Sequence, residues 1–292
     1  MAEAKKRWFD RRDGKRIKDL DGVHYMMPYL MPKRCDSEVY IQEKIDVTEV
    51  IKFVASKNGP DAPYKTTAFH VFAAAVAKIV IHRPILNRFI VNKHIYEREK
   101  VSLSFMAKRT FSDHSEEVLV KAIADGDTVL SDISKRVVGD VTKLRKGGTN
   151  DIDEALNFFK KMPRFLMSFI MMIFRLLDKY DWMPNSLKDG DTNYSSVLLS
   201  NLGSIKCGAP YHHLNEYGTN SIVATIGVIH KEPVYADDGS FEIRDVVDFG
   251  ITLDERIADG FYFAKSVKLL KYILAHPEML DKPFKEEVDY DV

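Results

Sequence analysis

The sequence lacks an excess of charge of either sign, because its 292 residues include 43 Lys and Arg and 43 Asp and Glu. A net charge of zero gives no global field that would attract nucleic acid or an anionic membrane. Cysteine is equally scarce: only Cys35 and Cys207 are present, without C-x-x-C spacing, so we expect neither a disulfide framework nor a zinc site. The hydrophobic content of 45% is ordinary for a protein with a substantial core.

The N-terminus is basic but lacks the apolar run of a secretory signal. We interpret residues 1–20 as a solvated or partner-bound arm in preference to a nucleic-acid arm. Internal repeats, low-complexity linkers and Gly-rich phosphate loops are missing as well, which indicates one domain over residues 21–285. We expect a cytoplasmic protein.

Hydrophobic periodicity predicts α-helices alternating with short strands, mostly antiparallel. Asp46 and Glu49 are spaced as a capping box for the first of these helices. The expected helices cover residues 47–55, 67–82, 129–146 and 260–275, and the expected strands cover 39–45, 88–92, 95–97, 101–107, 117–122, 194–200, 222–229, 233–235, 241–243 and 246–253.

Residues 150–190 contain an unusual apolar segment, in which Pro163 precedes a run rich in Phe and Met. The uncharged stretch 165–174 has about half the length that a bilayer span needs. Three interpretations remain: a buried core helix, the wall of a subunit interface or substrate tunnel, and an interfacial membrane helix over 163–177. The composition favours the buried helix over the other two.

Charged residues gather in the turn between the apolar segments 246–253 and 260–274, where the sequence reads Leu-Asp-Glu-Arg-Ile-Ala-Asp-Gly over 253–260. Charges at the junction of buried elements indicate either an ion pair that fixes the turn or a chemical site.

Three segments together give the chain a family resemblance: Ser-Asn-Leu-Gly at 200–203, the strand at 223–228, and the turn at 253–260. Their order and spacing resemble the chloramphenicol acetyltransferase-like superfamily, which includes the catalytic domain of the dihydrolipoamide acyltransferases. In that family the two ends read S-N-L-G and D-H-R-x-x-D-G. The resemblance covers roughly residues 16–280, with 150–190 as an enlarged connection.

The resemblance implies an α/β two-layer sandwich with a mixed, largely antiparallel sheet and helices on one face. It also implies a homotrimer whose active sites lie between subunits, and acyl transfer from a coenzyme A thioester without a metal. The family histidine removes a proton from the acceptor, and the aspartate, here Asp259 before Gly260, holds the loop. The serine, here Ser200 before Asn201, donates to the oxyanion.

The chain departs from this pattern at the histidine, whose position is occupied by Glu255. A carboxylate is an intrinsically poorer base than imidazole by roughly two pKa units, although burial can raise its pKa. His212 and His213, in a turn-like stretch after the S-N-L-G strand, offer a base from another backbone position. The alternative for this pair is an ordinary surface loop.

Arg16 is the expected partner of Asp259, with Arg256 as the nearer alternative and a structural residue. The absence of a lipoyl domain and an Ala/Pro-rich linker suggests a stand-alone acyltransferase that acts on a small-molecule amine, hydroxyl or thiol. The competing hypothesis is a catalytically silent trimeric relative that binds a ligand or partner.

Overall fold

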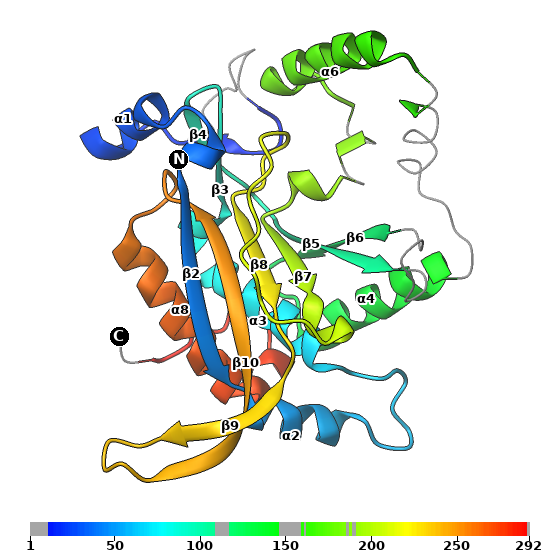
Figure 1. The fold of residues 1–292 in the computed structure, drawn as a ribbon, viewed down its shortest axis with the longest axis vertical. Coiled ribbons are helices and arrows are strands. Elements are labelled where there is room, and N and C mark those ends of the chain that lie inside the picture. Colours follow the sequence, from blue (N-terminus) through cyan, green and yellow to red (C-terminus); the bar gives the residue numbers. More distant parts are fainter. Residues whose placement is uncertain are drawn as a thin grey trace.

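The computed structural model describes residues 11–108, 117–145, 159–160, 162–184, 187–188 and 191–290. Its central element is a seven-stranded sheet in the order β2-β10-β8-β7-β5-β6, with β9 paired to β10 (Figure 1). The strands are β2 (Glu38–Asp46), β5 (Val101–Lys108), β6 (Glu117–Ala124), β7 (Val197–Asn201), β8 (Ile222–Ile226), β9 (His230–Tyr235) and β10 (Phe241–Asp254).

The sheet is mixed and largely antiparallel, as the resemblance implies. β7 runs parallel to both β5 and β8, whereas β2, β8 and β9 pair with β10 in antiparallel register. The expected hairpin after Tyr235 is the connection between β9 and β10, which extends well beyond the rest of the sheet (Figure 1).

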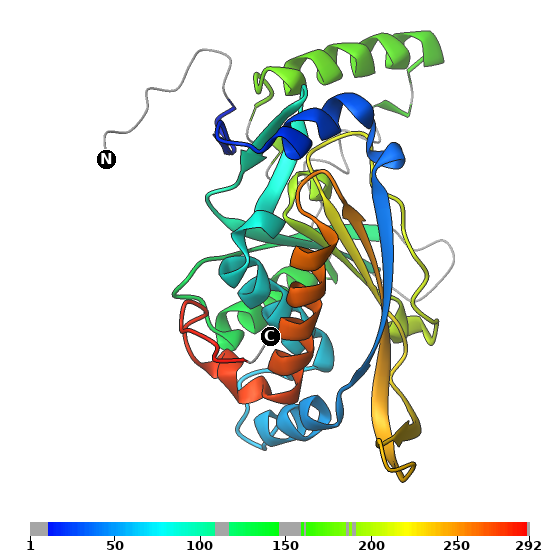
Figure 2. The same cartoon turned by 90° about the vertical axis from the view of Figure 1, so that its left-hand side faces the viewer.

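Four helices cover one face of this sheet: α2 (Thr48–Lys57), α3 (Ala68–His82), α4 (Leu130–Arg145) and α8 (Gly260–Ala275) (Figure 2). Helix α3 is the most deeply buried, because Ala73, Ala74, Ala75 and Ala77 let its neighbours approach closely and are at most 1% exposed. The two-layer α/β fold is therefore confirmed.

The expected capping box at the start of α2 is wrong. The helix begins at Thr48 with Val47 in the cap position, and the Asp46 carboxylate accepts from the Thr48 amide at 2.9 Å. Glu49 instead forms an ion pair with Lys52 at 2.8 Å. A short Asx turn at Asp46 thus replaces the reciprocal cap.

A second, three-stranded sheet has the order β1-β4-β3, from β1 (Lys15–Arg16), β4 (His94–Glu97) and β3 (Arg88–Val91). The interpretation of the N-terminus as a solvated arm is wrong for residues 11–16, because Lys15 and Arg16 form a strand and Arg11 is only 1% exposed. Residues 1–10 lie outside the described residues. The structure adds a short helix, α1 (Gly22–Leu30), that the periodicity did not predict.

The apolar segment forms helix α6 (Arg164–Lys179), which lies at one end of the molecule (Figure 1). The interpretation as a buried core helix is wrong, since Phe165 is 78% exposed and Phe169 is 54% exposed. The helix packs along one side only and presents its other side to solvent. Among the described helices, none has the length and apolar character needed to cross a bilayer.

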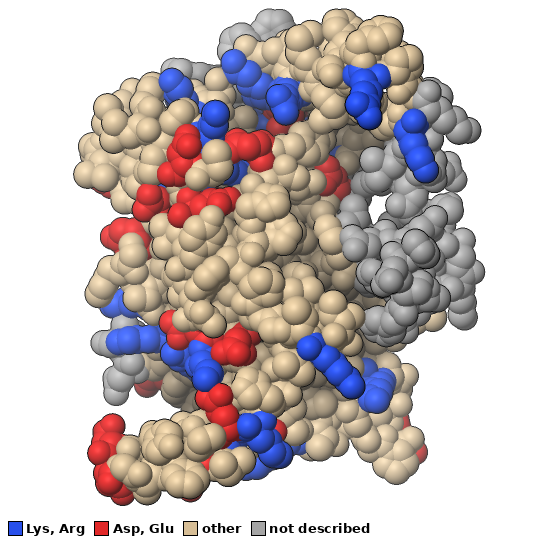
Figure 3. All heavy atoms as spheres, viewed as in Figure 1, with Lys and Arg blue, Asp and Glu red and all other residues tan. Residues whose placement is uncertain are grey.

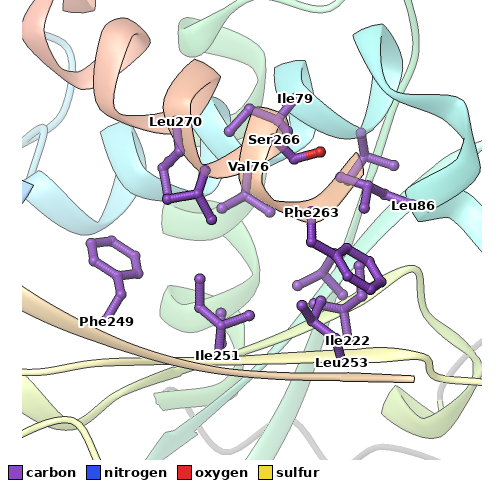
Figure 4. Close-up of a pocket in the computed structure, with 14 residues that line it drawn as sticks. Val76, Ile79, Leu86, Ile222, Phe249, Ile251, Leu253, Phe263, Ser266 and Leu270 are labelled. Carbon is purple, nitrogen blue, oxygen red and sulfur yellow. The ribbon is translucent and has the colours of Figure 1, made fainter. Parts of the chain in front are cut away.

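A cavity of about 70 Å³ lies between β10 and the helices α3 and α8. Figure 4 shows Phe249 and Ile251 on the strand side, opposite Val76 and Leu270 on the helices. Its lining is almost entirely apolar, so the cavity is expected to be dry. None of the predicted site residues lines it, and we interpret it as a packing defect of the core.

Candidate functional site

A buried ion pair fixes the turn that follows β10. Arg256 contacts Asp254 through two parallel hydrogen bonds, Nε to Oδ1 at 2.8 Å and Nη2 to Oδ2 at 2.7 Å. Both side chains are almost completely buried, and the Ser37 hydroxyl donates a further hydrogen bond to Asp254 at 3.1 Å. Bidentate pairs of this kind restrict geometry strongly, so Asp254 and Arg256 form a rigid frame.

Glu255 lies between the two members of this ion pair. Its backbone amide donates to the Ser37 carbonyl at 3.0 Å, which holds the turn against the segment before β2. The side chain is half-buried and has no hydrogen bond or ion pair to the residues that the structure describes. The backbone at Glu255 is therefore fixed, and the carboxylate remains available to a ligand or another copy.

Asp259 caps helix α8, and its carboxylate accepts from the Tyr262 amide at 2.7 Å. Gly260 opens the helix in free space, where an added Cβ would meet nothing within 4 Å. Within one chain these two residues set the start of the helix. Arg16 contacts His94 at 3.1 Å from strand β1, and its pairing with Asp259 stays a prediction.

Ser200 lies near the C-terminal end of β7, far from Glu255 along the sheet. The register pairs Ser200 with Thr225 of β8, and Thr225 with Gly250 of β10. Glu255 follows Gly250 by five positions, a separation of about 17 Å at the usual rise of a strand. The two predicted catalytic groups therefore sit toward opposite ends of the strands in one chain.

The motif around Ser200 also has a structural role. Asn201 ends β7 and accepts a hydrogen bond from the Ser204 hydroxyl at 2.8 Å. A Cβ on Gly203 would lie 2.3 Å from the Gly227 carbonyl oxygen, a distance that no side chain tolerates. The glycine of S-N-L-G is thus required for the close approach of two backbones beside Ser200.

His212 and His213 lie on an exposed loop, where their rings stack at 4.7 Å and His212 Nδ1 contacts the His213 carbonyl at 2.8 Å. The next residue, Leu214, donates its amide to Glu38, which is the register partner of Asp254. This loop therefore approaches the end of the sheet that carries Glu255. Neither histidine has a hydrogen bond or ion pair with Glu255 among the described contacts.

Two surface hollows flank the turn. The smaller, of about 180 Å³, lies between the start of α1 and the capped end of α8 and is lined by Asp259 and Tyr262, among others. The larger, of about 380 Å³, lies beside Arg256 below α6. Its charged lining residues are Arg34, Lys93, Arg175, Asp178, Lys179, Glu216 and Arg256, so cations outnumber carboxylates.

Residues just before β2 contribute to this site and were not anticipated. Arg34 is buried and donates to the carbonyls of Asn215 and Gly218 at 2.8 and 2.7 Å, and burial lowers the pKa of its guanidinium. Together with Ser37 it ties the histidine loop and the Glu255 turn to one short segment. No sequence motif marks these contacts, because they join positions about two hundred residues apart.

Residues 181–281, which include both Ser200 and Glu255, match the model of the family described as 2-oxoacid dehydrogenases acyltransferase (catalytic domain). This match confirms the resemblance that the three motifs predict. The chain has no match among curated proteins.

Solved structures confirm the fold over nearly the whole chain. A probable dihydrolipoamide acetyltransferase from Listeria monocytogenes is 17% identical, with a TM-score of 0.61 over 94% of this chain and 98% of that one. The Azotobacter vinelandii dihydrolipoamide acetyltransferase is 16% identical, with a TM-score of 0.57 over 90% and 98%. A chloramphenicol acetyltransferase is 12% identical, with a TM-score of 0.52 over 89% and 99%.

Proposed function

We propose that the protein is a stand-alone acyltransferase that moves an acyl group from a thioester such as acyl-CoA to a small-molecule amine, hydroxyl or thiol. Its sites form between copies of a homotrimer. The observation that carries this proposal is the placement of Ser200 and Glu255 toward opposite ends of the strands within one family match. A second copy is needed to bring one group to the other.

Glu255 serves as the base in this proposal. The Azotobacter vinelandii enzyme is described with a serine, a histidine and an asparagine in its catalytic mechanism, the last two four positions apart. Glu255 and Asp259 have the same spacing, with the carboxylate in the place of the histidine. A carboxylate is suited to an amine acceptor, because it binds the ammonium form before it accepts a proton.

The reaction then has two steps. Glu255 takes the proton of the acceptor N–H, O–H or S–H as that atom attacks the thioester carbonyl, and the Ser200 hydroxyl of another copy donates to the resulting oxyanion. The C–S bond breaks as the carbonyl re-forms, and the leaving thiolate recovers the proton from Glu255. The rigid Asp254–Arg256 pair keeps the backbone of the turn in place throughout.

The larger hollow beside the turn fits the anionic part of such a donor. Its lining contains more cations than carboxylates, and one of those carboxylates, Asp178, is already paired with Arg11. Lys93 lies on its border, whereas the guanidinium of Arg256 is already paired with Asp254 and the Met31 carbonyl. Basic side chains of this kind suit phosphate oxygens.

Thiol release from acetyl-CoA and longer acyl-CoAs, measured against a panel of amines, alcohols and thiols, tests the activity. We expect Glu255→Gln to lower kcat by about 10²–10⁴-fold, since it removes the base without changing the size of the side chain. Ser200→Ala should lower kcat by about 10²–10³-fold. Glu49→Gln, a matched change on the exposed side of α2, should leave turnover unchanged.

Mixing the two inactive variants tests the shared site directly. If each site takes Glu255 from one copy and Ser200 from another, co-expressed Ser200→Ala and Glu255→Gln chains should regain about a quarter of wild-type activity. A mixture that stays inactive, despite measured formation of mixed trimers, would show that each chain works alone.

The second candidate function is a catalytically silent binding protein of the same fold. It is favoured by the Glu255 carboxylate, which has no described partner to orient it as a base. Under this hypothesis Glu255→His would create or restore acyl transfer. If Glu255 is the catalytic base, the same substitution should lower the native activity. Replacing His212 and His213 with Ala tests whether the base has moved to the loop.

A further inference from the structure

Helix α6 presents one continuous apolar stripe to solvent. The exposed residues follow the spacing i, i+4, i+7, i+8 and i+11, so that they lie on one side of the helix. They are Phe165, Phe169, Met172, Ile173 and Leu176, with exposed fractions of 78%, 54%, 58%, 36% and 53%. In the part of the chain that the structure describes, only α1 exposes as many large apolar residues, namely Val23, Tyr25, Met26, Tyr29 and Leu30.

Every exposed charge of α6 is positive. Arg164, Arg175 and Lys179 are exposed, and their positions place them along one border of the apolar stripe. The one carboxylate of the helix, Asp178, is buried and pairs with Arg11. Figure 3 shows basic side chains at the upper end of the molecule, where α6 lies in Figure 1.

Buried ion pairs anchor the C-terminal end of α6 to the rest of the molecule. Arg11 contacts both Asp178 and Asp181, while Arg12 and Lys188 also pair with Asp181. These carboxylates are largely inaccessible, so the contacts fix the orientation of the helix end. The stripe is consequently held outward and is not free to fold back onto the sheet.

We propose that α6 docks the protein on the surface of a bilayer that contains anionic lipid. The helix lies in the plane of the interface, with its aromatic and aliphatic side chains among the acyl chains and its Arg and Lys at the phosphates. Arg175 and Lys179 carry positive charges, which the negatively charged headgroups would neutralise. This inference does not depend on the proposed acyl transfer, although Arg175 and Lys179 also line the larger hollow that was assigned to the acyl donor.

A bilayer fits these features better than a second copy of the chain. In an antiparallel two-fold contact through α6, the same cationic border would meet itself, and like charges in an interface oppose association. The uneven Phe, Met and Leu surface suits a fluid apolar phase. A self-contact is therefore an outcome that the test must separate from lipid binding.

Vesicle co-sedimentation tests the proposal with the full chain. We expect binding to vesicles of 70% phosphatidylcholine and 30% phosphatidylglycerol, and much weaker binding to pure phosphatidylcholine. The variant Phe165→Ser/Phe169→Ser/Leu176→Ser should lower the partition coefficient at least about tenfold, because apolar area drives insertion. The variant Tyr235→Ser/Phe241→Ser/Ile243→Ser is a matched control, because these hairpin residues are equally exposed and far from α6.

The contribution of the α6 cations to binding and the depth to which α6 inserts are measured separately. Replacing Arg164, Arg175 and Lys179 with Gln should lower binding by about fivefold per cation, and added salt should have the same effect. With both Trp8 and Trp182 changed to Phe, a Phe169→Trp reporter should be quenched by lipids brominated in their acyl chains. A protein that stays at the headgroup level would show no quenching.

Three results would overturn the proposal: no binding to the anionic vesicles, equal binding by the α6 and hairpin variants, or an unquenched reporter. Light scattering must also show the same number of copies for the wild type and the α6 variant. A change in that number would instead identify the stripe as a contact between copies.

Discussion

Helices α3 and α6 are both dominated by apolar residues, yet one lies in the centre of the molecule and the other at its edge. In α3, ten of the residues from His70 to Val80 are buried, whereas α6 buries only Asp178. Alanines along α3 allow a sheet and three helices to close around it. The one lysine of α3, Lys78, is buried and donates to the carbonyls of Phe284 and Glu286, whereas the cations of α6 are exposed beside its bulky side chains, so that helix retains an open side.

Matched Phe→Ala changes on the two helices give the largest expected contrast. Phe72 of α3 is 2% exposed and packs edge-to-face against Phe249 at 5.4 Å. Its replacement should lower the free energy of unfolding by about 3–5 kcal/mol, whereas Phe169→Ala should cost less than about 0.5 kcal/mol. Urea unfolding measures both. Similar losses of unfolding free energy in the two variants would mean that α6 is covered in solution.

Removing the buried ion pairs that anchor α6 gives a second measurement in which α6 and α3 should behave differently. Arg11→Met leaves Asp178 without its buried partner, whereas Asp181 keeps Lys188, and removal of one partner of a buried ion pair typically costs about 3–5 kcal/mol locally. Hydrogen exchange should then rise in α6 and remain unchanged in α3. Arg244→Met, which removes exposed ion pairs of β10, provides the control. Equal exchange in both helices would contradict a local anchor.

A titratable group lies in α3, where burial lowers the pKa of His70 to about 4. The folded state therefore resists protonation that the unfolded chain accepts near pH 6.5, so stability is present above that pH and is lost as pH falls toward 4. We expect a loss of about 2 kcal/mol between pH 7 and pH 5. Protonation would also end the acceptor role of Nδ1 toward the Thr67 amide.

The measurement is the urea midpoint as a function of pH, compared between the wild type and His70→Gln. The variant should show a flatter dependence between pH 7 and pH 5. An equal slope in both proteins would assign the acid sensitivity to other groups.

The smallest effect concerns the cavity that α3 borders. Val76→Ile adds one methylene toward this space, and burial of a methylene contributes about 0.8 kcal/mol where it fits without strain. A rise in the thermal midpoint would confirm that α3 is incompletely packed at this point. Ile173→Leu on α6, which conserves volume on an open surface, should leave the midpoint unchanged.

Much of the fold was predictable because its elements carry regular patterns. The alternation over 39–45 predicted β2, which spans Glu38–Asp46, and the expected helix at 260–275 has the bounds of α8. Helix α1 was missed because nine residues that include Pro28 show no clear period. The exposure of α6 was missed because its uncharged centre hid the cations at either end, and burial depends on partners that periodicity does not identify.

The site was predictable only where it is local in sequence. Arg256 and Asp254 were expected as a frame for Glu255, and they form one. The contact of Ser37 with Asp254 joins positions 217 residues apart, so only the folded chain reveals it. The same holds for the separation of Ser200 from Glu255, which follows from the antiparallel direction of β10.

The turn at Glu255 has a consequence for how such a protein changes over generations. Its backbone is held by the Asp254–Arg256 pair and by the amide contact to Ser37, and none of these uses the side chain at position 255. A base can be exchanged there without rebuilding the loop around it. A histidine, a glutamate or a neutral residue can therefore occupy position 255 on an unchanged scaffold. Substitution of this one residue can create or remove the catalytic function.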